Sequence, residues 1–423
     1  MKKTLLTICL TWMCFSLSAQ KIIDLSGKWS FSIDRQDNGE KEKWFSHTLN
    51  DFINLPGSMP EKLKGDEVTA KTQWTGSLYD SSYYYNPYME KYRKEGNIKF
   101  PFFLTPDKHY VGAAWYQKEV NIPADWKGER ILLFLERPHI ETTVWVNGQK
   151  TGMQNSLCVP HQYDITRYVR PGKCTITIRV DNRIKEINVG PDSHSITDQT
   201  QGNWNGIVGR ICLQTTPKTY FDDIQIYPEP EQKLARVKVV IKGTGTAKVK
   251  LSAESFNTDK KHIVPAIQQE IKLNKGVTET EMVLPMGNDM LLWDEFHPAL
   301  YKLKAEVTNG KKTEIKEIQF GMRRFEIKGK WFYVNGRKTQ LRGTVENCDF
   351  PLTGYAPMDV ESWERVFRIC RSYGLNHMRF HSFCPPEAAF MAADRVGFYL
   401  QPEGPSWPNH CLLYTSPSPR DTR

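Results

Sequence analysis

The sequence has little of what marks several classes of protein. After residue 20, no apolar run of the 423-residue chain is long enough to cross a membrane. Two of the nine cysteines lie in the first 19 residues and the other seven lie far apart, which argues against a metal cage or a disulfide scaffold. The net charge of +9 comes from scattered lysines and arginines, with no basic block. We therefore expect no membrane span, no cofactor or metal, and no nucleic-acid partner.

Residues 1–19 have the pattern of a signal peptide. Lys2 and Lys3 give a positive start, residues 5–17 are apolar, and residues 17–19 form an acceptable cleavage site. Cys14 follows Trp12 and Met13 rather than small residues, which disfavours a lipid-anchored lipoprotein. The mature protein is expected to be periplasmic or secreted.

Residues 20–217 alternate short β-rich runs with turn residues, which predicts an antiparallel sandwich. Asn147 and Gly148 predict a tight hairpin, because both residues tolerate a positive φ. The expected strands are 30–33, 114–122, 130–135, 142–146, 174–180 and 211–213.

Residues 75–109 are rich in tyrosine and are interrupted by Pro87. A segment this long without structure of its own is usually functional or disordered. Tyrosine rings can stack on sugar rings, but we expect these rings mainly to pack the segment onto its own domain. They are Tyr79, Tyr83, Tyr84, Tyr85, Tyr88 and Tyr92.

A second β module is expected over residues 218–328. Its runs alternate apolar residues with lysines and glutamates, which is typical of a half-buried sheet with a solvated face. The pattern favours an immunoglobulin-like sandwich without a cluster of reactive residues. The expected strands are 236–241, 248–253, 280–284, 300–307 and 313–320.

The region 329–410 changes to alternating strands and helices. A hairpin is predicted over 331–342, and its second arm is expected to become the first of three parallel strands, followed by 376–382 and 397–401. Helices are predicted over 358–373 and 388–396. Polar residues follow each strand, which is how a β/α barrel with functional groups at its carboxyl ends begins.

Several short stretches distributed along the chain match one known family. They are 25–31, 114–116, 136–148, 203–207, 292–293, 298–301, 321–325 and 334–343. In this order and at these distances they resemble glycoside hydrolase family 2, the β-galactosidase, β-glucuronidase and β-mannosidase group, over nearly the whole mature length. The resemblance implies a multidomain fold: an all-β jelly-roll sandwich that binds sugar, an immunoglobulin-like β-sandwich, and a (β/α)8 TIM barrel that carries catalysis.

The chemistry of that family needs two carboxylates, one to exchange a proton with the leaving oxygen and one to attack the anomeric carbon. The family carries them on the fourth and seventh barrel strands, whereas three strands are predicted here. We therefore expect a truncated barrel without either catalytic glutamate, and residues 411–423, which continue no barrel pattern, are expected to be a non-native tail. The resemblance assigns Glu403 to a supporting role.

The resemblance also implies a set of substrate-binding residues. Asn347 falls where the family places a polar sugar contact. Arg379 matches an arginine that supports the catalytic carboxylate, and a buried ion pair inside the barrel is compatible with that role. His381 and Ser382 reverse the usual Ser-His order, so His381 is either a sugar contact or a wall residue.

Two further candidates lie outside the first two strand ends. Asp198 corresponds to a loop acid that reaches over the barrel mouth in some members, with a plain surface aspartate as the alternative. Trp407 can form an aromatic platform beside the sugar.

The predicted function is a retaining exo-acting glycoside hydrolase that breaks O-glycosyl bonds in polysaccharides. The alternative is a non-catalytic secreted protein that binds carbohydrate. A structural adhesin would need repeats of the sandwich unit, and the sequence has none. The sugar, the linkage and the oligomeric state, including a homo-oligomer, stay open.

Overall fold

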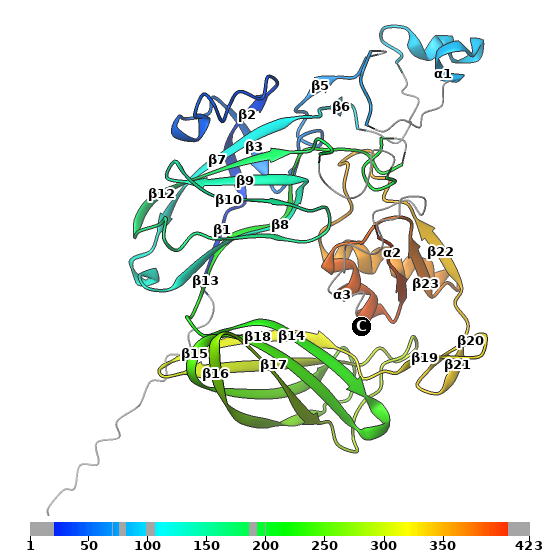
Figure 1. The fold of residues 1–423 in the computed structure, drawn as a ribbon. Coiled ribbons are helices and arrows are strands. Elements are labelled where there is room, and N and C mark those ends of the chain that lie inside the picture. The colour runs from blue at the N-terminus through cyan, green and yellow to red at the C-terminus, as the bar shows by residue number, and fades with distance from the viewer. Residues whose placement is uncertain are drawn as a thin grey trace, which may run out of the picture.

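The computed structural model describes residues 21–69, 71–75, 82–98, 106–185, 193–198 and 200–404. Figure 1 shows two β-sheet bodies and a smaller part that contains both helices and strands. The predicted signal peptide, Trp407 and the predicted tail 411–423 lie outside the described residues. No helix in the described part of the chain is long and apolar enough to cross a membrane.

The first body is a sandwich of two antiparallel sheets, which packs a continuous apolar core that includes Trp29, Tyr116 and Ile178. One sheet has the order β1 (Ile22–Asp24), β13 (Gly206–Thr216), β8 (Arg130–His139) and β11 (His161–Asp164), with β4 (Gly57–Ser58) paired to β13. The other has the order β10 (Gln149–Asn155), β9 (Glu141–Val146), β12 (Gly172–Asp181), β7 (Ala113–Ile122), β2 (Gly27–Asp34) and β3 (Asp51–Leu55).

The predicted hairpin at Asn147 and Gly148 is confirmed. Strands β9 and β10 pair antiparallel on either side of it, with Gln149 opposite Val146. Asn147 has a φ of 50° and Gly148 a φ of 77°, as a tight hairpin turn requires. Shorter elements of this body are η1 (Trp44–Ser46), η3 (Ala124–Trp126), and β5 (Asp66–Glu67) paired with β6 (Lys108–His109).

Residues 82–98 of the tyrosine-rich segment form a small projection with α1 (Ser82–Tyr85) and η2 (Pro87–Arg93), at the end of the molecule in Figure 1. Tyr79 lies outside the described residues. Tyr83 is buried and its hydroxyl donates to the Tyr92 carbonyl oxygen at 3.0 Å. Tyr84, Tyr85 and Tyr88 are exposed, so the expectation that the tyrosines mainly pack the segment is wrong for these three. The two short helices can bury side chains only on the side where they face each other, and the tyrosines on their other sides are left in solvent.

The second body contains β14 (Tyr220–Glu229), η4 (Pro230–Gln232), β15 (Leu234–Phe256), β16 (Ile263–Pro285), β17 (Leu300–Asn309) and β18 (Lys312–Phe320). The predicted alternation is present: Val237 and Val239 are buried, while Lys238 pairs with Glu279 on the solvent face. The two strands expected over 236–241 and 248–253 form one strand, β15. Its register against β16 shifts between Gly243 and Gly245, so the strand bends without ending.

The third part begins with a small antiparallel sheet of β19 (Phe325–Lys328), β20 (Trp331–Val334) and β21 (Arg337–Thr339). The expected continuation of the hairpin arm into the first parallel strand is wrong, because β21 ends at Thr339 and β22 (Gly343–Glu346) starts a separate sheet.

A parallel sheet follows, in the order β22, β23 (His377–Phe380) and β24 (Tyr399–Gln401). The connections contain α2 (Val360–Ser372) and α3 (Glu387–Val396). Asp359 caps α2 by accepting from the Ser362 amide, and Trp363, Phe367, Met378 and Phe380 form the core between helices and strands. In the described residues this sheet has three strands and does not close into a barrel.

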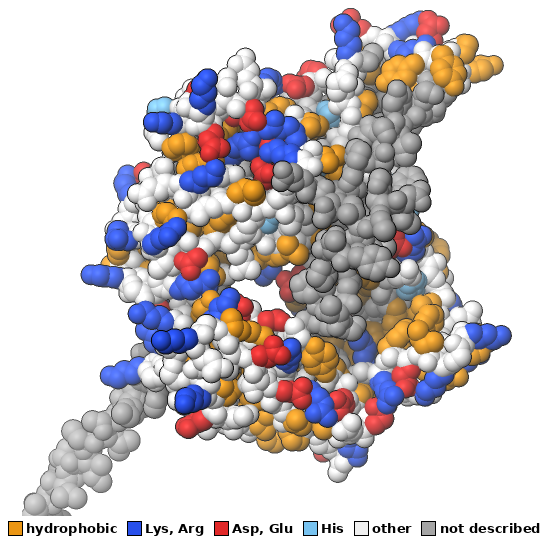
Figure 2. Space-filling view, in the orientation of Figure 1, with side chains coloured by type: hydrophobic (Ala, Val, Ile, Leu, Met, Phe, Trp, Pro, Cys, Tyr) orange, Lys and Arg blue, Asp and Glu red, His pale blue; other side chains and the backbone are white. Residues whose placement is uncertain are grey.

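The surface in Figure 2 carries lysines, arginines, aspartates and glutamates interspersed rather than segregated by sign. Many of them are paired across neighbouring strands, as in Lys238 with Glu279 and Lys250 with Glu306. The positive net charge is therefore spread over solvated strand faces on this side of the molecule.

The third part packs closely on both sheet bodies. The Ser58 hydroxyl donates to the Thr353 carbonyl oxygen, and the Tyr355 hydroxyl donates to Glu61 at 2.9 Å. On the other side, Trp293 Nε1 donates to the Asp394 carbonyl oxygen at 2.7 Å, and Arg371 Nη1 donates to that of Glu295 at 2.6 Å. These contacts fix the parallel sheet relative to the first and the second β-sheet body.

We predict that Gly397→Ala loosens this packing. Gly397 has a φ of 77° and a Cβ there would lie 2.7 Å from the Glu295 carbonyl oxygen. Gly374 has a φ of 79° with nothing within 4 Å of the same position, so Gly374→Ala carries the backbone cost of about 1 kcal/mol without the clash. We expect Gly397→Ala to lower the free energy of unfolding by about 2 kcal/mol more. The free energies of unfolding of both variants are measured by denaturant melts. Equal losses in Gly397→Ala and Gly374→Ala would show that the backbone of Glu295 does not press on position 397.

We predict that Glu314→Gln stabilises the second body at pH 7. Glu314 is buried, its Oε2 accepts from the Phe221 amide at 2.6 Å, and its Oε1 has no hydrogen-bond partner. Burial raises the pKa of this carboxyl above its ordinary value of 4.5. As pH rises, Glu314 therefore loses its proton in the unfolded chain before it does so in the folded protein. The free energy of unfolding of the wild type accordingly falls as pH rises above about 4.5. Thermal melts should show a stabilised variant at pH 7 and a difference that vanishes toward pH 4. A constant difference at both pH values would contradict the assignment.

Candidate functional site

The parallel pairing brings the residues that follow the three strands to one edge. Val345 lies beside Arg379, and Arg379 lies beside Gln401, so the carboxyl ends of β22, β23 and β24 are level. Asn347, His381 and Glu403 follow these ends directly. Three candidates that are distant in sequence are thereby neighbours at one edge of the sheet.

The two faces of this sheet differ. Met378 and Phe380 point to the helices and are buried among α2 and α3. Arg379, between them in β23, therefore points to the opposite face, where its side chain is 41% exposed. Val345 shares that face and is also exposed. The functional groups thus stand on the open face of the sheet, away from the helices.

Arg379 and Glu403 form the centre of the site. Arg379 Nε lies 2.5 Å from Glu403 Oε1, and the Ser382 amide donates to Glu403 Oε2 at 2.9 Å. Burial acts to raise the pKa of Glu403, but the hydrogen bonds from Arg379 and Ser382 outweigh it and hold the pKa below its usual value. Glu403 is therefore an ionised carboxylate with both oxygens engaged, which suits a supporting role.

A loop of the first sandwich reaches this edge. Gln201 Nε2 donates to the His381 carbonyl oxygen at 2.7 Å. The His194 ring lies edge-on to the His381 ring with centroids 4.9 Å apart, and its Nδ1 lies 3.4 Å from the Ser382 hydroxyl. Burial, together with the nearby His381, lowers the pKa of His194. The site is thus built from two parts of the molecule.

Asp198 neither reaches the strand ends nor lies on the surface, so both interpretations offered for it are wrong. Its carboxylate accepts from the Thr75 amide at 2.7 Å and from the Asn203 amide at 3.1 Å, and it lies 3.3 Å from His109 Nε2. The side chain is 2% exposed. All three partners belong to the first sandwich, so Asp198 shapes the loop that carries His194 and Gln201.

The remaining candidates are placed as follows. Asn347 is exposed at the end of β22. The main chain of His381 is fixed by its amide, which donates to the Glu346 carbonyl oxygen at 2.9 Å. Trp407 lies outside the described residues. Sequence reasoning missed His194 and Gln201, and their position within the same short loop as Asp198 was the available signal.

Two acids, Glu346 at the end of β22 and Asp349 just after it, lie on the other side of the sheet. Glu346 alternates with Val345 and points toward the helices, where its Oε1 accepts from the Cys348 amide at 2.8 Å. Burial raises the pKa of Glu346, and burial with the charge of Glu346 raises the pKa of Asp349 to about 6. This pair does not share the open face with Arg379 and Glu403. Across the described residues, no group of His, Cys, Asp and Glu is arranged to hold a metal ion.

Comparison with known proteins gives sequence relatives and structural neighbours. A β-galactosidase of Thermoanaerobacter pseudethanolicus is 24% identical over 74% of this chain and 42% of its own length. The human β-glucuronidase is 23% identical over 90% of this chain and 57% of its own length. The chain therefore spans about half the length of these relatives.

Solved structures share the fold. A glycosyl hydrolase family 2 member from Bacteroides cellulosilyticus superposes with a TM-score of 0.64 at 20% identity, over 90% of this chain and 47% of that one. A β-glucuronidase from Ruminococcus gnavus superposes with a TM-score of 0.66 at 20% identity, over 91% of this chain and 59% of that one.

Two family models match consecutive parts of the chain. The sugar-binding domain of glycosyl hydrolases family 2 matches residues 22–217. A second model, described as glycosyl hydrolases family 2, matches residues 219–323. Together they cover well over half of the sequence, and the chain belongs to glycosyl hydrolase family 2.

Proposed function

We propose that this chain is part of a retaining, exo-acting glycoside hydrolase that cleaves β-linked sugars from polysaccharides. The observation that carries the proposal is the Arg379, Glu403 and Ser382 cluster on the open face of three parallel strands, with His194 beside it. Charged and polar groups from two parts of the chain converge there. The names of the relatives, β-galactosidase and β-glucuronidase, support an O-glycosidic substrate.

The three parallel strands are proposed to be the first part of a (β/α)8 barrel. Their order follows the sequence and their helices lie on one face, as in such a barrel. The open face that bears Arg379 is then the barrel interior, and its exposure here leaves room for further strands.

The two reacting carboxylates are proposed to stand on later strands of that barrel. A retaining mechanism needs them about 5–5.5 Å apart, one protonated and one free to attack. Glu403 is held ionised, with Arg379 and Ser382 on its two oxygens. Glu346 and Asp349 lie on the helix side. None of the three therefore suits either reacting role.

The residues present are proposed to orient the sugar and the reacting carboxylates. Arg379 offers guanidinium donors at the open face beside Glu403, where it can pair with an incoming carboxylate or hydroxyl. His194, His381 and Asn347 supply further groups for sugar hydroxyls at the same edge. The sugar-binding sandwich thus takes part in the active site through its 193–201 loop.

The setting of the enzyme is also a proposal. The signal-peptide pattern of residues 1–19 supports a periplasmic or secreted protein that meets polysaccharide outside the cytoplasm.

The complete reading frame tests this function directly. A fourth strand followed by Asn-Glu, with a second glutamate at a seventh strand, is the expected finding. A natural stop codon near Leu413 would instead favour the non-catalytic carbohydrate-binding protein, because the reacting carboxylates would then have no source.

We predict that the 423-residue polypeptide itself does not hydrolyse nitrophenyl β-galactoside or β-glucuronide. The physical reason is that, of the three acids at the strand ends, only Glu403 stands on the open face, whereas a retaining mechanism needs two carboxyl groups there. Release of nitrophenol is measured beside the product of the complete reading frame, which serves as the positive control. Turnover by the shorter polypeptide at a comparable rate would refute the assignment of the reacting acids.

We predict that Arg379→Met in the complete enzyme lowers kcat/KM about 100-fold, because the supporting carboxylate and the sugar lose their alignment. The pKa of Glu403 should rise once the guanidinium is gone, so the acid limb of the pH profile moves to higher pH. Arg368→Met removes an exposed arginine from an ion pair with Glu364 on α2 and is the control. Equal values of kcat/KM for the two variants would show that Arg379 has no role at the site.

A further inference from the structure

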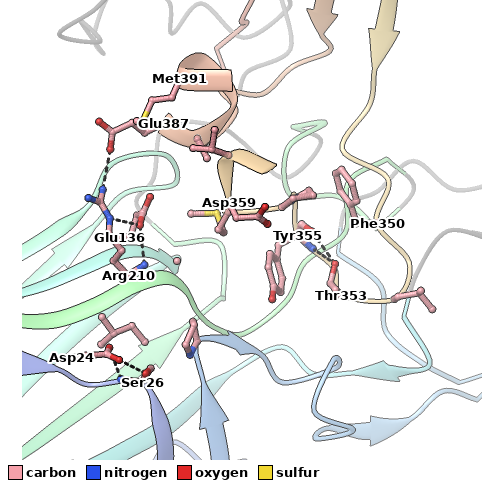
Figure 3. Close-up of a pocket in the computed structure, with 18 of the residues that line it drawn as sticks. Asp24, Ser26, Glu136, Arg210, Phe350, Thr353, Tyr355, Asp359, Glu387 and Met391 are labelled. Atoms are coloured by element: carbon pink, nitrogen blue, oxygen red, sulfur yellow. Dashed lines mark hydrogen bonds and ion pairs between the residues drawn. The ribbon is translucent and has the colours of Figure 1, made fainter. Parts of the chain in front are cut away.

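A cavity separate from the strand-end site lies between the first sandwich and the third part. Its volume is about 870 Å³, within the range of ligand pockets. One side is formed by β1, β8 and β13, and the other by residues 349–360 and the start of α3. Figure 3 shows labelled side chains from both sides facing the same space.

The cavity and the strand-end site lie on opposite faces of the parallel sheet. Val360, Ala388 and Met391 line the cavity and belong to α2 and α3, which cover the helix face of the sheet. Arg379 and Val345 occupy the other face. A ligand in the cavity would therefore leave the strand-end site free.

One wall of the cavity is polar and fixed. Arg210 joins the first sandwich to α3, with Nε 2.8 Å from Glu136 Oε2 and Nη2 2.9 Å from Glu387 Oε2. The Arg210 amide also donates to Glu136 Oε2 at 2.8 Å. These groups are on one side in Figure 3, and their positions are set by mutual hydrogen bonds before any ligand arrives.

The facing wall is aromatic. Phe350 and Tyr355 stand there, on the side of the cavity away from Arg210 and Glu387 in Figure 3. The Tyr355 ring is held by its hydroxyl, which donates to Glu61 at 2.9 Å, and by the Trp204 ring, with centroids 5.5 Å apart. The cavity therefore offers a rigid apolar face opposite a row of hydrogen-bonding groups.

The charges of the cavity select against anions. The described lining residues include five carboxyl groups, one arginine, and no lysine or histidine. The carboxyl groups belong to Asp24, Glu136, Asp349, Asp359 and Glu387. Such a lining is rich in hydrogen-bond acceptors and poor in donors. Burial, together with the neighbouring charge of Glu346, raises the pKa of Asp349 to about 6.

We infer that this cavity is a second carbohydrate-binding site, for neutral pyranose units of a glycan. A pyranose ring has an apolar C–H face that packs on aromatic rings and a rim of hydroxyl groups that donate to carboxylates. Phe350 and Tyr355 match the first feature, and Glu136, Glu387 and Asp349 match the second. A uronic acid would bring a further negative charge into the acidic lining and is disfavoured. The inference does not require catalysis by this chain.

The test measures the binding of four sugars to the 423-residue protein at pH 7, by saturation-transfer NMR and by calorimetry. The sugars are lactose, cellobiose, glucuronic acid and galactosamine. We expect both neutral disaccharides to bind at millimolar concentration and glucuronic acid to bind more weakly. Phe350→Ala should weaken the binding of lactose about five- to tenfold. Phe296→Ala, which removes an exposed phenylalanine remote from the cavity, should leave it unchanged.

Two further variants keep the result decisive if Phe350→Ala folds poorly. Asp349→Asn should narrow the preference for lactose over glucuronic acid, because one negative charge of the lining is lost. Glu403→Gln reports separately on any sugar held at the strand-end site. Binding abolished by Glu403→Gln but kept in Phe350→Ala would place the sugar at the strand ends and overturn the inference. Galactosamine carries a positive charge and should bind more tightly than glucuronic acid. The reverse order, or no binding by any sugar, would also overturn the inference.

Discussion

The parallel hydrogen bonding of β22, β23 and β24 is the constraint on which the candidate site depends. Parallel pairing puts all three carboxyl ends at one edge, so residues separated by 24 positions, Arg379 and Glu403, meet as an ion pair. An antiparallel arrangement of the same segments would send every second strand end to the other edge. The direction of the strands therefore decides which residues meet at the open face.

The alternation of side chains along these strands separates two environments within one sheet. Met378 and Phe380 supply the apolar face that holds α2 and α3, and Arg379 between them is free to serve the open face. The same alternation sends Glu346 to the helix side, next to Asp349. These short strands thereby support a polar site on one face and a packed core with the helices on the other.

The first sandwich is a structural partner of the site rather than a detached module. Asp198 is saturated by donors of its own domain, and this fixes the loop from which Gln201 and His194 contact the end of β23. Tyr355 and Glu61 make a comparable contact on the helix side. Both places are therefore built jointly by the first sandwich and the third part.

The sequence by itself determined the features that depend on near neighbours. Alternating residues such as Val237 and Lys238 specify a half-buried strand, Asn147 and Gly148 specify a hairpin, and Asp359 marks the start of α2. The order of strands and helices after residue 340 was predictable for the same reason. Only the tertiary structure decided that Gln201 meets His381, 180 residues away, that Asp198 is enclosed, and that Phe350 faces Arg210 across a cavity. These contacts join segments whose local patterns carry no information about each other, and they arise when the separate bodies pack.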